Sequence, residues 1–461
     1  MRERKRIFTN FSFYDPQTIQ SKLEEMAAKG WMIQKVGNLF WIFEKIPPQR
    51  LRFAVTYFPG ASEFDPRPSQ KQLDKEDFCA QDGWKLVLRW DAMQIFCNDR
   101  EDAVPIETDP VPQVENIRRV MKKKVFATQL FTAVFMLWYV YFQLTRIWKD
   151  PADYLSNGFY LFSLPLWVLL FFAAIREAWT YLFWSFRAKR AAEDGMFLPV
   201  KRSKWLDWAI PLLSTLFLLL AFAGGGFHLL YIVCWTGMMG MVFFLTNRLM
   251  GWMKKKGAPR GINLAVSCAC VMVLTLAGVA GIAAAVIGGW LPAGEDSQPV
   301  DTYDWDGLTM DIYDDPLPLT VEDLVEVDAQ WSKEARFQES PLVAYGDYRQ
   351  DLLFGQEIQG YELSYEITDV KLPQLYEFVK ERLISQRQDE VYEDFVFVDH
   401  YEPIDPTPWG AQEAYQLLGN DGLMNTYLVC WESRIVEIKF YWTPTAQQIT
   451  RVADILHMES T

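Results

Sequence analysis

Few residues of this 461-residue chain combine a type and a spacing that could support chemistry. His400 stands beside Asp399 and near Asp405, and it is the one histidine whose neighbours suit acid–base catalysis. No serine or cysteine nucleophile lies in a recognisable setting around it. We therefore expect His400 to be a surface or packing residue, and we predict no catalytic residues.

A pair of cysteines could hold a metal ion. Cys268 and Cys270 form a C-x-C pair inside a long apolar run, but no His or Asp stands nearby to complete a coordination shell. We expect them to be packing residues. Elsewhere the chain has no Gly-rich phosphate loop, paired-Cys zinc pattern or basic nucleic-acid stripe. The sequence thus predicts no cofactor and no nucleic-acid partner.

A group of aspartates faintly resembles a calcium loop. Asp304, Asp306 and Asp311 surround Gly307, within an acidic and turn-rich stretch. The stretch lacks the alternating ligands and the closing Glu of an EF-hand. We interpret it as a solvated acidic linker and predict no metal site.

The middle of the chain is strongly apolar. Five stretches reach the length of about 20 apolar residues that a bilayer core requires: residues 125–145, 158–175, 206–223, 227–246 and 262–290. Trp and Tyr gather at their ends, as at membrane interfaces. The middles of the stretches contain no ionisable residue, which disfavours charge-coupled transport. We predict an α-helical transmembrane bundle of five spans over residues 122–290, in contact with the lipid bilayer.

The distribution of charge predicts the orientation of the spans. Lys and Arg are concentrated at residues 118–124, 187–204 and 248–260, on alternate connections. Residues 261–332 contain no Lys or Arg, while twelve acidic residues stand between Glu295 and Asp328. The positive-inside rule therefore predicts a multi-pass cell-membrane protein with a cytoplasmic N-terminus and an extracytoplasmic C-terminus.

Small residues recur at every fourth position of the last apolar stretch. This stripe allows another helix to approach closely, either within the bundle or from a second copy in a homo-oligomer. Its members are Ala277, Gly281, Ala285 and Gly289.

The N-terminal hundred residues repeat a short phrase. Residues 27–31 read AAKGW, residues 80–84 read AQDGW, and the strand-like residues 40–43 and 93–96 follow at the same offset. Gly30 and Gly83 are suited to end a helix in the left-handed conformation. We predict a small α+β domain over residues 1–100 that contains a repeated helix-Gly-Trp-strand-strand unit, with its aromatic residues in the core.

The same region resembles a known family. The stretches LEEMAAKGWMIQKVGNLFWIFEK, RFAVTYFP and CAQDGWKLVLRWDAMQIF are similar to the bacterial domain of unknown function DUF2812, over roughly residues 5–100. The resemblance implies a cytoplasmic module followed by membrane helices in a Gram-positive membrane protein, commonly encoded beside a PadR-like repressor. It implies no site residues.

Two linkers and a second domain complete the predicted organisation. Residues 101–121 are Pro-rich and acidic and read as a tether, and residues 291–330 form the acidic linker. Residues 331–461 predict an extracytoplasmic α+β domain, with a hairpin about Glu432-Ser433-Arg434 and a final helix capped by Thr445. Cys430 is the one cysteine there, which excludes an internal disulfide.

These observations favour a non-enzymatic multi-pass membrane protein. A folded domain on each side of the membrane suits a sensory or regulatory component, with a protein partner on the cytoplasmic side. Two alternatives stay open at this point: a transporter or transporter accessory for an uncharged or lipidic substrate, and an external domain that binds a ligand or metal or hydrolyses a substrate.

Overall fold

The computed structural model describes residues 3–8, 12–37, 40–200, 203–225, 229–288, 299–305, 308–353, 360–391 and 396–458. The chain divides into two compact units. Unit 1 comprises Met1–Leu137, Val168–Ser214 and Tyr231–Gly288, and unit 2 comprises Trp138–Trp167, Thr215–Leu230 and Gly289–Thr461. The division falls inside long helices, so some helices contribute residues to both units.

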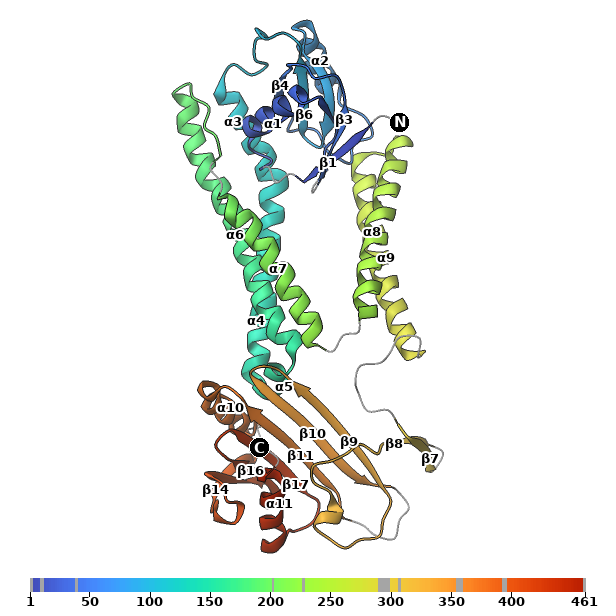
Figure 1. Ribbon diagram of the computed structural model, residues 1–461, viewed down its shortest axis with the longest axis vertical. Helices are drawn as coiled ribbons and strands as arrows, with labels where there is room; N and C mark the ends of the chain where they lie inside the picture. The colour runs from blue at the N-terminus through green and yellow to red at the C-terminus, as the bar shows by residue number, and fades with distance from the viewer. Residues whose placement is uncertain are drawn as a thin grey trace. The chain divides into compact units, whose positions relative to one another are not determined.

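The N-terminal domain of unit 1 consists of two helices and two three-stranded antiparallel sheets (Figure 1). The sheets have the strand orders β1-β3-β2 and β4-β6-β5. The elements are β1 (Arg4–Phe8), α1 (Pro16–Ala28), β2 (Trp31–Lys35), β3 (Phe40–Lys45), β4 (Arg52–Tyr57), α2 (Gln70–Gln81), β5 (Lys85–Trp90) and β6 (Met93–Asn98). Each sheet thus takes one strand before a helix and two strands after it.

The two helices of this domain end in the same way. Gly30 follows α1 with φ 81° and Gly83 follows α2 with φ 82°, both in the left-handed region that favours glycine. In each sheet the strand after the helix carries a register irregularity, between Ile33 and Lys35 in β2 and between Leu86 and Leu88 in β5. The two halves therefore share their strand order, their helix ends and the place of their bulge.

Aromatic and aliphatic side chains fill the core of the N-terminal domain. α1 contributes Ile19 and Leu23, and the sheets contribute Phe43, Tyr57 and Ile95, all fully buried. The far end of helix α6 enters the same core, through Tyr181, Trp184, Ala188 and Ala192. The domain is therefore packed directly against a helix that lies more than eighty residues later in the chain.

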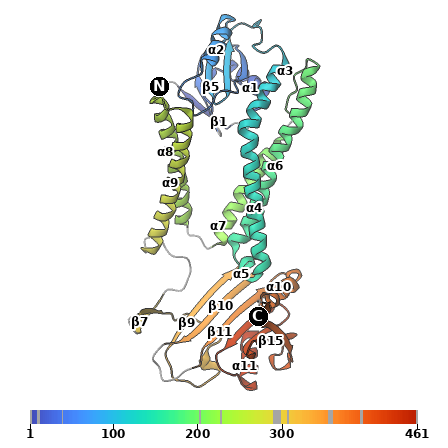
Figure 2. The ribbon, with the colours of Figure 1, turned by 180° about the vertical axis from the view of Figure 1, so that it is seen from behind.

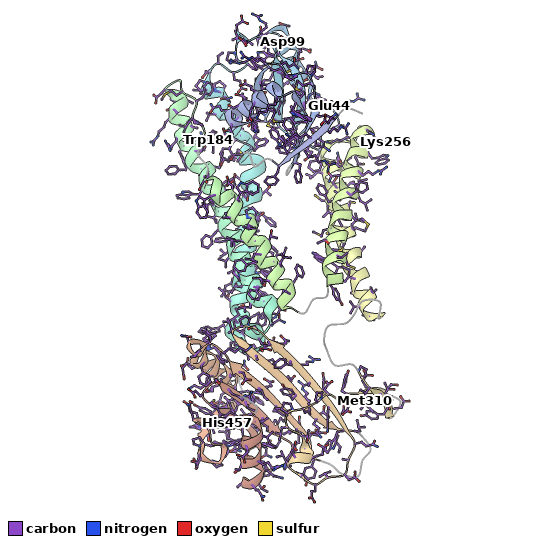
Figure 3. The ribbon with its side chains drawn as sticks, viewed as in Figure 1. Glu44, Asp99, Trp184, Lys256, Met310 and His457 are labelled. Atoms are coloured by element: carbon purple, nitrogen blue, oxygen red, sulfur yellow. The ribbon has the colours of Figure 1, made fainter. Side chains whose placement is uncertain are left out.

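Long helices make up the rest of unit 1 and the start of unit 2. They are α3 (Pro110–Val120), the π-helix η1 (Met121–Phe126), α4 (Ala127–Lys149), α5 (Pro151–Ser156), α6 (Gly158–Glu193), α7 (Lys204–Gly224), α8 (Leu229–Lys255) and α9 (Arg260–Ile287). Figures 1 and 2 show α8 and α9 side by side. A Cβ placed at Gly278 of α9 would meet the side chain of Met238 of α8, so these two helices approach closely at that glycine.

Four helices within the described residues are long and apolar enough to cross a membrane. They are Thr128–Lys149, Gly158–Glu193, Trp205–Gly224 and Arg260–Ile287. Four of the five predicted stretches are thus confirmed as apolar helices of sufficient length. The remaining stretch, 227–246, lies largely in α8, which is helical but is not among those four.

Two segments differ from the sequence-based expectation. The predicted tether 101–121 contains the helix α3, whose start is capped by Asp109 accepting from the backbone N–H of Val111 at 2.9 Å. Helix α6 continues well past the predicted end of its apolar stretch at residue 175 and reaches Glu193. Both extensions bring helical residues into the core of the N-terminal domain.

The C-terminal domain, in unit 2, is built on an antiparallel sheet of seven strands in the order β14-β15-β16-β17-β11-β10-β9. Its hairpin β16–β17 turns at Glu432 and Ser433, as predicted. The sheet strands are β9 (Trp331–Glu339), β10 (Val343–Leu352), β11 (Leu363–Val370), β14 (Asp399–Ile404), β15 (Glu413–Gly419), β16 (Gly422–Cys430) and β17 (Arg434–Phe440). The short pairs are β7 (Asp301–Trp305) with β8 (Leu308–Ile312), and β12 (Glu390–Val391) with β13 (Val396–Phe397).

Helices cover both faces of this sheet. α11 (Ala446–Met458) and the turns η2 (Val321–Asp323) and η3 (Thr407–Trp409) pack on one face. α10 (Pro373–Gln386) and the short helix α5 pack on the other, where Ala152 and Leu155 of α5 are buried against Val343 of β10. The hydroxyl of Ser340 donates to the carbonyl of Leu155 at 2.6 Å. The C-terminal domain is therefore docked on the connection between α4 and α6.

Candidate functional site

A polar concavity of about 580 Å³ lies on the sheet face that also carries α10. Side chains alternate between the two faces of a strand, so the odd-numbered residues of β10 from Val343 to Asp351 share this face. Val343 and Tyr345 pack in the hydrophobic core beneath α10, whereas Asp347, Arg349 and Asp351 line the concavity. α10 thus covers one part of the face and leaves a charged part uncovered.

Three carboxylates form a row across the floor of the concavity. Asp347 of β10 is paired with Glu366 of β11, which is paired in turn with Glu437 of β17. Like charges at directly opposed positions destabilise a sheet. The neighbouring row reads Arg349, Ser364, Lys439 and Thr426, and it is neutral or basic. The floor therefore presents an acidic row beside a basic one.

The outer carboxylates of the acidic row have basic partners. Arg387, just after α10, places its guanidinium 3.2 Å from Glu437 Oε1 and 3.6 Å from Asp399 Oδ2. At the opposite end, Arg349 lies 3.2 Å from Asp347. Both arginines are partly exposed, so these ion pairs contribute little to stability and can exchange for a ligand.

The central carboxyl of the row has an altered acidity. Burial, followed by the negative charge of Glu437, raises the pKa of Glu366 to about 7, against a hydrogen bond from Tyr345 that lowers it. Burial and the charge of Glu366 in turn raise the pKa of Tyr345. Glu366 therefore changes its protonation near neutral pH.

Aromatic side chains border the concavity. The ammonium of Lys439 lies 4.3 Å from the ring centroid of Tyr441 and donates to its hydroxyl at 3.1 Å. Phe397, which also lines the concavity, is 45% exposed. An apolar wall beside a few convergent polar groups is the usual composition of a small-molecule site.

The histidine considered from the sequence lies at the edge of this region but makes a different contact. His400 Nδ1 is 2.7 Å from Asp389 Oδ1, and that hydrogen bond raises the pKa of the exposed imidazole. Asp399 instead faces Arg387, and Asp405 accepts from the backbone N–H of Thr407 at 3.0 Å. The structure thus does not bring the three residues together as an acid–base group.

The residues considered for metal binding are also separated. Asp304 accepts from the hydroxyl of Thr309 at 2.6 Å in the β7–β8 hairpin, whereas Asp306 and Gly307 lie outside the described residues. Cys270 receives a contact from Thr246 at 3.9 Å, and Cys268 is exposed on α9. Within the described ranges, no three His, Cys, Asp or Glu side chains are grouped to hold a metal ion.

The small residues of α9 divide between two environments. Gly278, outside the predicted stripe, is the glycine against α8. A Cβ at Gly281 would meet no heavy atom within 4 Å, so that position of the stripe is open. Ala277 and Ala285 lie on the described part of the same helix, and Gly289 lies outside it.

Sequence reasoning missed the concavity. The signal was present in β10, where Asp347, Arg349 and Asp351 alternate with buried residues, but an alternating strand with charges on one face normally indicates a solvated surface. The pairing of β11 with β17 creates the acidic row, and that pairing joins strands some seventy residues apart.

Comparison with known proteins finds a family model that is similar to part of the chain. Residues 15–129 match the model of a family described as a protein of unknown function, DUF2812. The match covers the N-terminal domain from α1 onward, α3 and the first residues of α4, and it supports the resemblance drawn from the sequence. No curated protein and no solved structure matches the chain.

Proposed function

We propose that this chain is a non-enzymatic multi-pass membrane protein of sensory or regulatory type. Its C-terminal domain recognises a small polar ligand outside the cell, and its N-terminal domain acts on a protein partner in the cytoplasm. The observation that supports this best is that both domain cores draw on one helical segment, α4 to α6: the N-terminal core includes the far end of α6, and the C-terminal core includes α5 and is packed against the end of α4. A protein that only anchored two domains would not need to pack each of them on that segment.

The orientation follows from charge. The basic ends of α3, α6 and α8 belong on the cytoplasmic side, and the acidic segment after α9 belongs outside. Four helices have the length and composition of membrane spans, and α8 is proposed as a fifth. An odd number of spans agrees with domains on opposite sides.

The ligand class follows from the concavity. Its charged side chains include five carboxylates and three cations, and Glu366 in the middle is only partly ionised at neutral pH. A small molecule with a cationic or hydrogen-bond-donating group at one end and an anionic group at the other matches the acidic and basic rows. The volume of about 580 Å³ suits a ligand of metabolite size.

The proposed coupling of the two domains through the α4–α6 segment can be tested at α5. Leu155 is 8% exposed and packs in the core beneath α10, so Leu155→Ala leaves a cavity at the connection between α4 and α6. In full-length protein in lipid nanodiscs, we expect faster amide hydrogen exchange in residues 181–192 of α6 and in α1. Unchanged protection of β16 and β17 would show that the C-terminal sheet is still folded.

The matched control is Leu423→Ala. This substitution removes the same side-chain atoms as Leu155→Ala, but Leu423 lies on β16 and is 56% exposed. Identical exchange of the N-terminal domain in Leu155→Ala and Leu423→Ala protein would contradict the proposed coupling. A change confined to Leu155→Ala would support it.

We also propose that two copies of the chain associate through the open face of α9, at Ala277, Gly281 and Ala285. The empty space around Gly281 supports close approach of a second helix there. Gly281→Leu is expected to reduce chemical cross-linking of the full-length protein in nanodiscs. Gly261→Leu on the same helix, where a Cβ also meets open space, is the control, and equal cross-linking of the two variants would contradict the proposal.

A further inference from the structure

We propose that a cavity between α3 and α6 binds the phosphate headgroup of an anionic phospholipid. The cavity has a volume of about 410 Å³ and lies wholly within unit 1. This inference uses the membrane placement proposed above but not the sensory role.

Cations line the rim of the cavity. Arg118 and Arg119 are adjacent in α3, and Lys122 of η1 follows four and three residues later, so all three can line the same cavity. Arg119 is engaged by Glu115 at 2.5 Å. Among the described residues, no ion pair involves Arg118 or Lys122. These two cations are therefore available to an anion.

Hydroxyl groups form the base. Tyr181 and Ser185 of α6 are 6% and 5% exposed, and their side chains are hydrogen-bonded to each other. The guanidinium of Arg118 is close enough to Tyr181 to interact with it electrostatically. Because one hydroxyl of this pair donates to the other, the pair offers one O–H donor to a phosphate oxygen, in the same cavity as the cationic groups.

Apolar side chains form the remaining border. Phe126, Leu182 and Phe186 line the same cavity, and Phe186 is 66% exposed. Phe126 lies two residues before the first helix of membrane-spanning length, which begins at Thr128. A free phosphate would gain nothing from such a border, whereas the glycerol and upper acyl carbons of a lipid would be buried against it. The site is therefore assigned to a lipid.

The test uses full-length protein in a neutral detergent, titrated with dioleoyl phosphatidylglycerol and measured by native mass spectrometry. Arg118→Gln with Lys122→Gln removes the two available cations. Because each cation near an anionic lipid surface strengthens binding roughly fivefold, we expect the double variant to bind phosphatidylglycerol at least ~10-fold more weakly. Ser185→Ala is expected to weaken the same binding without any change of charge.

The control variant, Lys255→Gln with Lys256→Gln, loses the same charge at the end of α8, outside the cavity, and should bind within about twofold of the unaltered protein. Equal loss in the two double variants would overturn the assignment, because it would show general attraction only. Equal affinity for dioleoyl phosphatidylcholine would also overturn it. Glycerol 3-phosphate binding as tightly as the lipid would reassign the cavity to a soluble phosphate.

These outcomes are distinct from a failure of membrane placement. A chain that does not enter membranes would remain in the supernatant of detergent-free lysates, whatever its affinity for phosphatidylglycerol. Circular dichroism of each variant shows whether the helices have been kept.

Discussion

Single side chains in the C-terminal domain carry out two different tasks. In the concavity, Asp347, Glu366 and Glu437 are opposed across three strands, an arrangement that costs stability in a sheet. On the other face, Asp369 and Arg434 are opposed across β11 and β17 and form a complementary pair. The like-charged row on one face contrasts with the complementary ion pair on the other, and this contrast agrees with the proposed role of the row in ligand recognition.

Glu366→Gln is expected to change how stability depends on pH. The pKa of Glu366 is about 7 in the folded chain and lies near 4.5 when unfolded, so the folded state holds its proton more tightly. The contribution of Glu366 to the free energy of unfolding is therefore fully present below pH 4.5 and is lost as the pH rises through 7. The Glu366→Gln variant should therefore have nearly the same free energy of unfolding as wild type at pH 4.5. At pH 8 the variant should be more stable than wild type by at most about 3 kcal/mol.

Thermal unfolding of the full-length protein in detergent at the two pH values measures this difference. Asp405→Asn is the control, because Asp405 is exposed and its pKa is lowered rather than raised. A Glu366→Gln variant that showed the same difference from wild type at both pH values would contradict the assignment.

Arg434→Lys is expected to destabilise the C-terminal domain by about 1–3 kcal/mol. Arg434 is 7% exposed and binds Asp369 through Nε at 2.6 Å and Nη2 at 2.8 Å, and it also donates to the carbonyl of Leu456 in α11. Lysine keeps the charge but cannot form the two-pronged contact. Denaturant unfolding should show the loss, while Arg336→Lys on the exposed surface should show none.

At the scale of elements, the N-terminal domain repeats one arrangement of a strand, a helix and two strands. Gly30 and Gly83 close the two helices at equivalent positions, and the bulges in β2 and β5 follow at equivalent positions. The two halves are thus alike in arrangement. Strands of both halves contribute to the core that contains α1 and α6, and the other side of β4 and β6 packs with α2.

The two glycines should differ in their tolerance of a side chain. A Cβ at Gly30 would stand 2.8 Å from the carbonyl oxygen of Ile46, whereas a Cβ at Gly83 would stand 3.3 Å from the amide of Asn98. Both positions require positive φ, which costs an alanine roughly 1–2 kcal/mol. Gly30→Ala adds a clash with backbone that cannot move aside, so it should be the more destabilising of the two in thermal unfolding. Equal losses would contradict this account.

Much of this element structure could be predicted from the sequence, because local rules govern it. The ends of α1 and α2 follow from glycine, and four helices long enough to cross a membrane follow from apolar length. α3 was missed because its Pro-rich, acidic surroundings indicated a tether, although Asp109-Pro110 is the same helix start as Asp15-Pro16. The concavity could not be predicted, because strand order decides which charges become neighbours, and strand order is set by long-range packing.

At the scale of the whole molecule, the proposed function requires the two domains to occupy different compartments. The distribution of basic residues predicts that Met1 and Thr461 lie on opposite sides of the membrane. Single cysteines placed at each end of a cysteine-free variant should therefore differ in labelling by a membrane-impermeant maleimide in intact cells. We expect the C-terminal site to be labelled and the N-terminal site to be labelled only after lysis. Labelling of both ends in intact cells would contradict the orientation.

The π-helix η1 joins α3, which is packed in the N-terminal domain, to α4, which has the composition of a span. Because it holds more residues per turn than an α-helix, it offsets the faces of the two flanking helices by roughly 100° for each extra residue. Rewinding these six residues as α-helix would therefore rotate α4 about its own axis relative to α3. Such a rotation would exchange the side chains that α4 presents in a given direction for others.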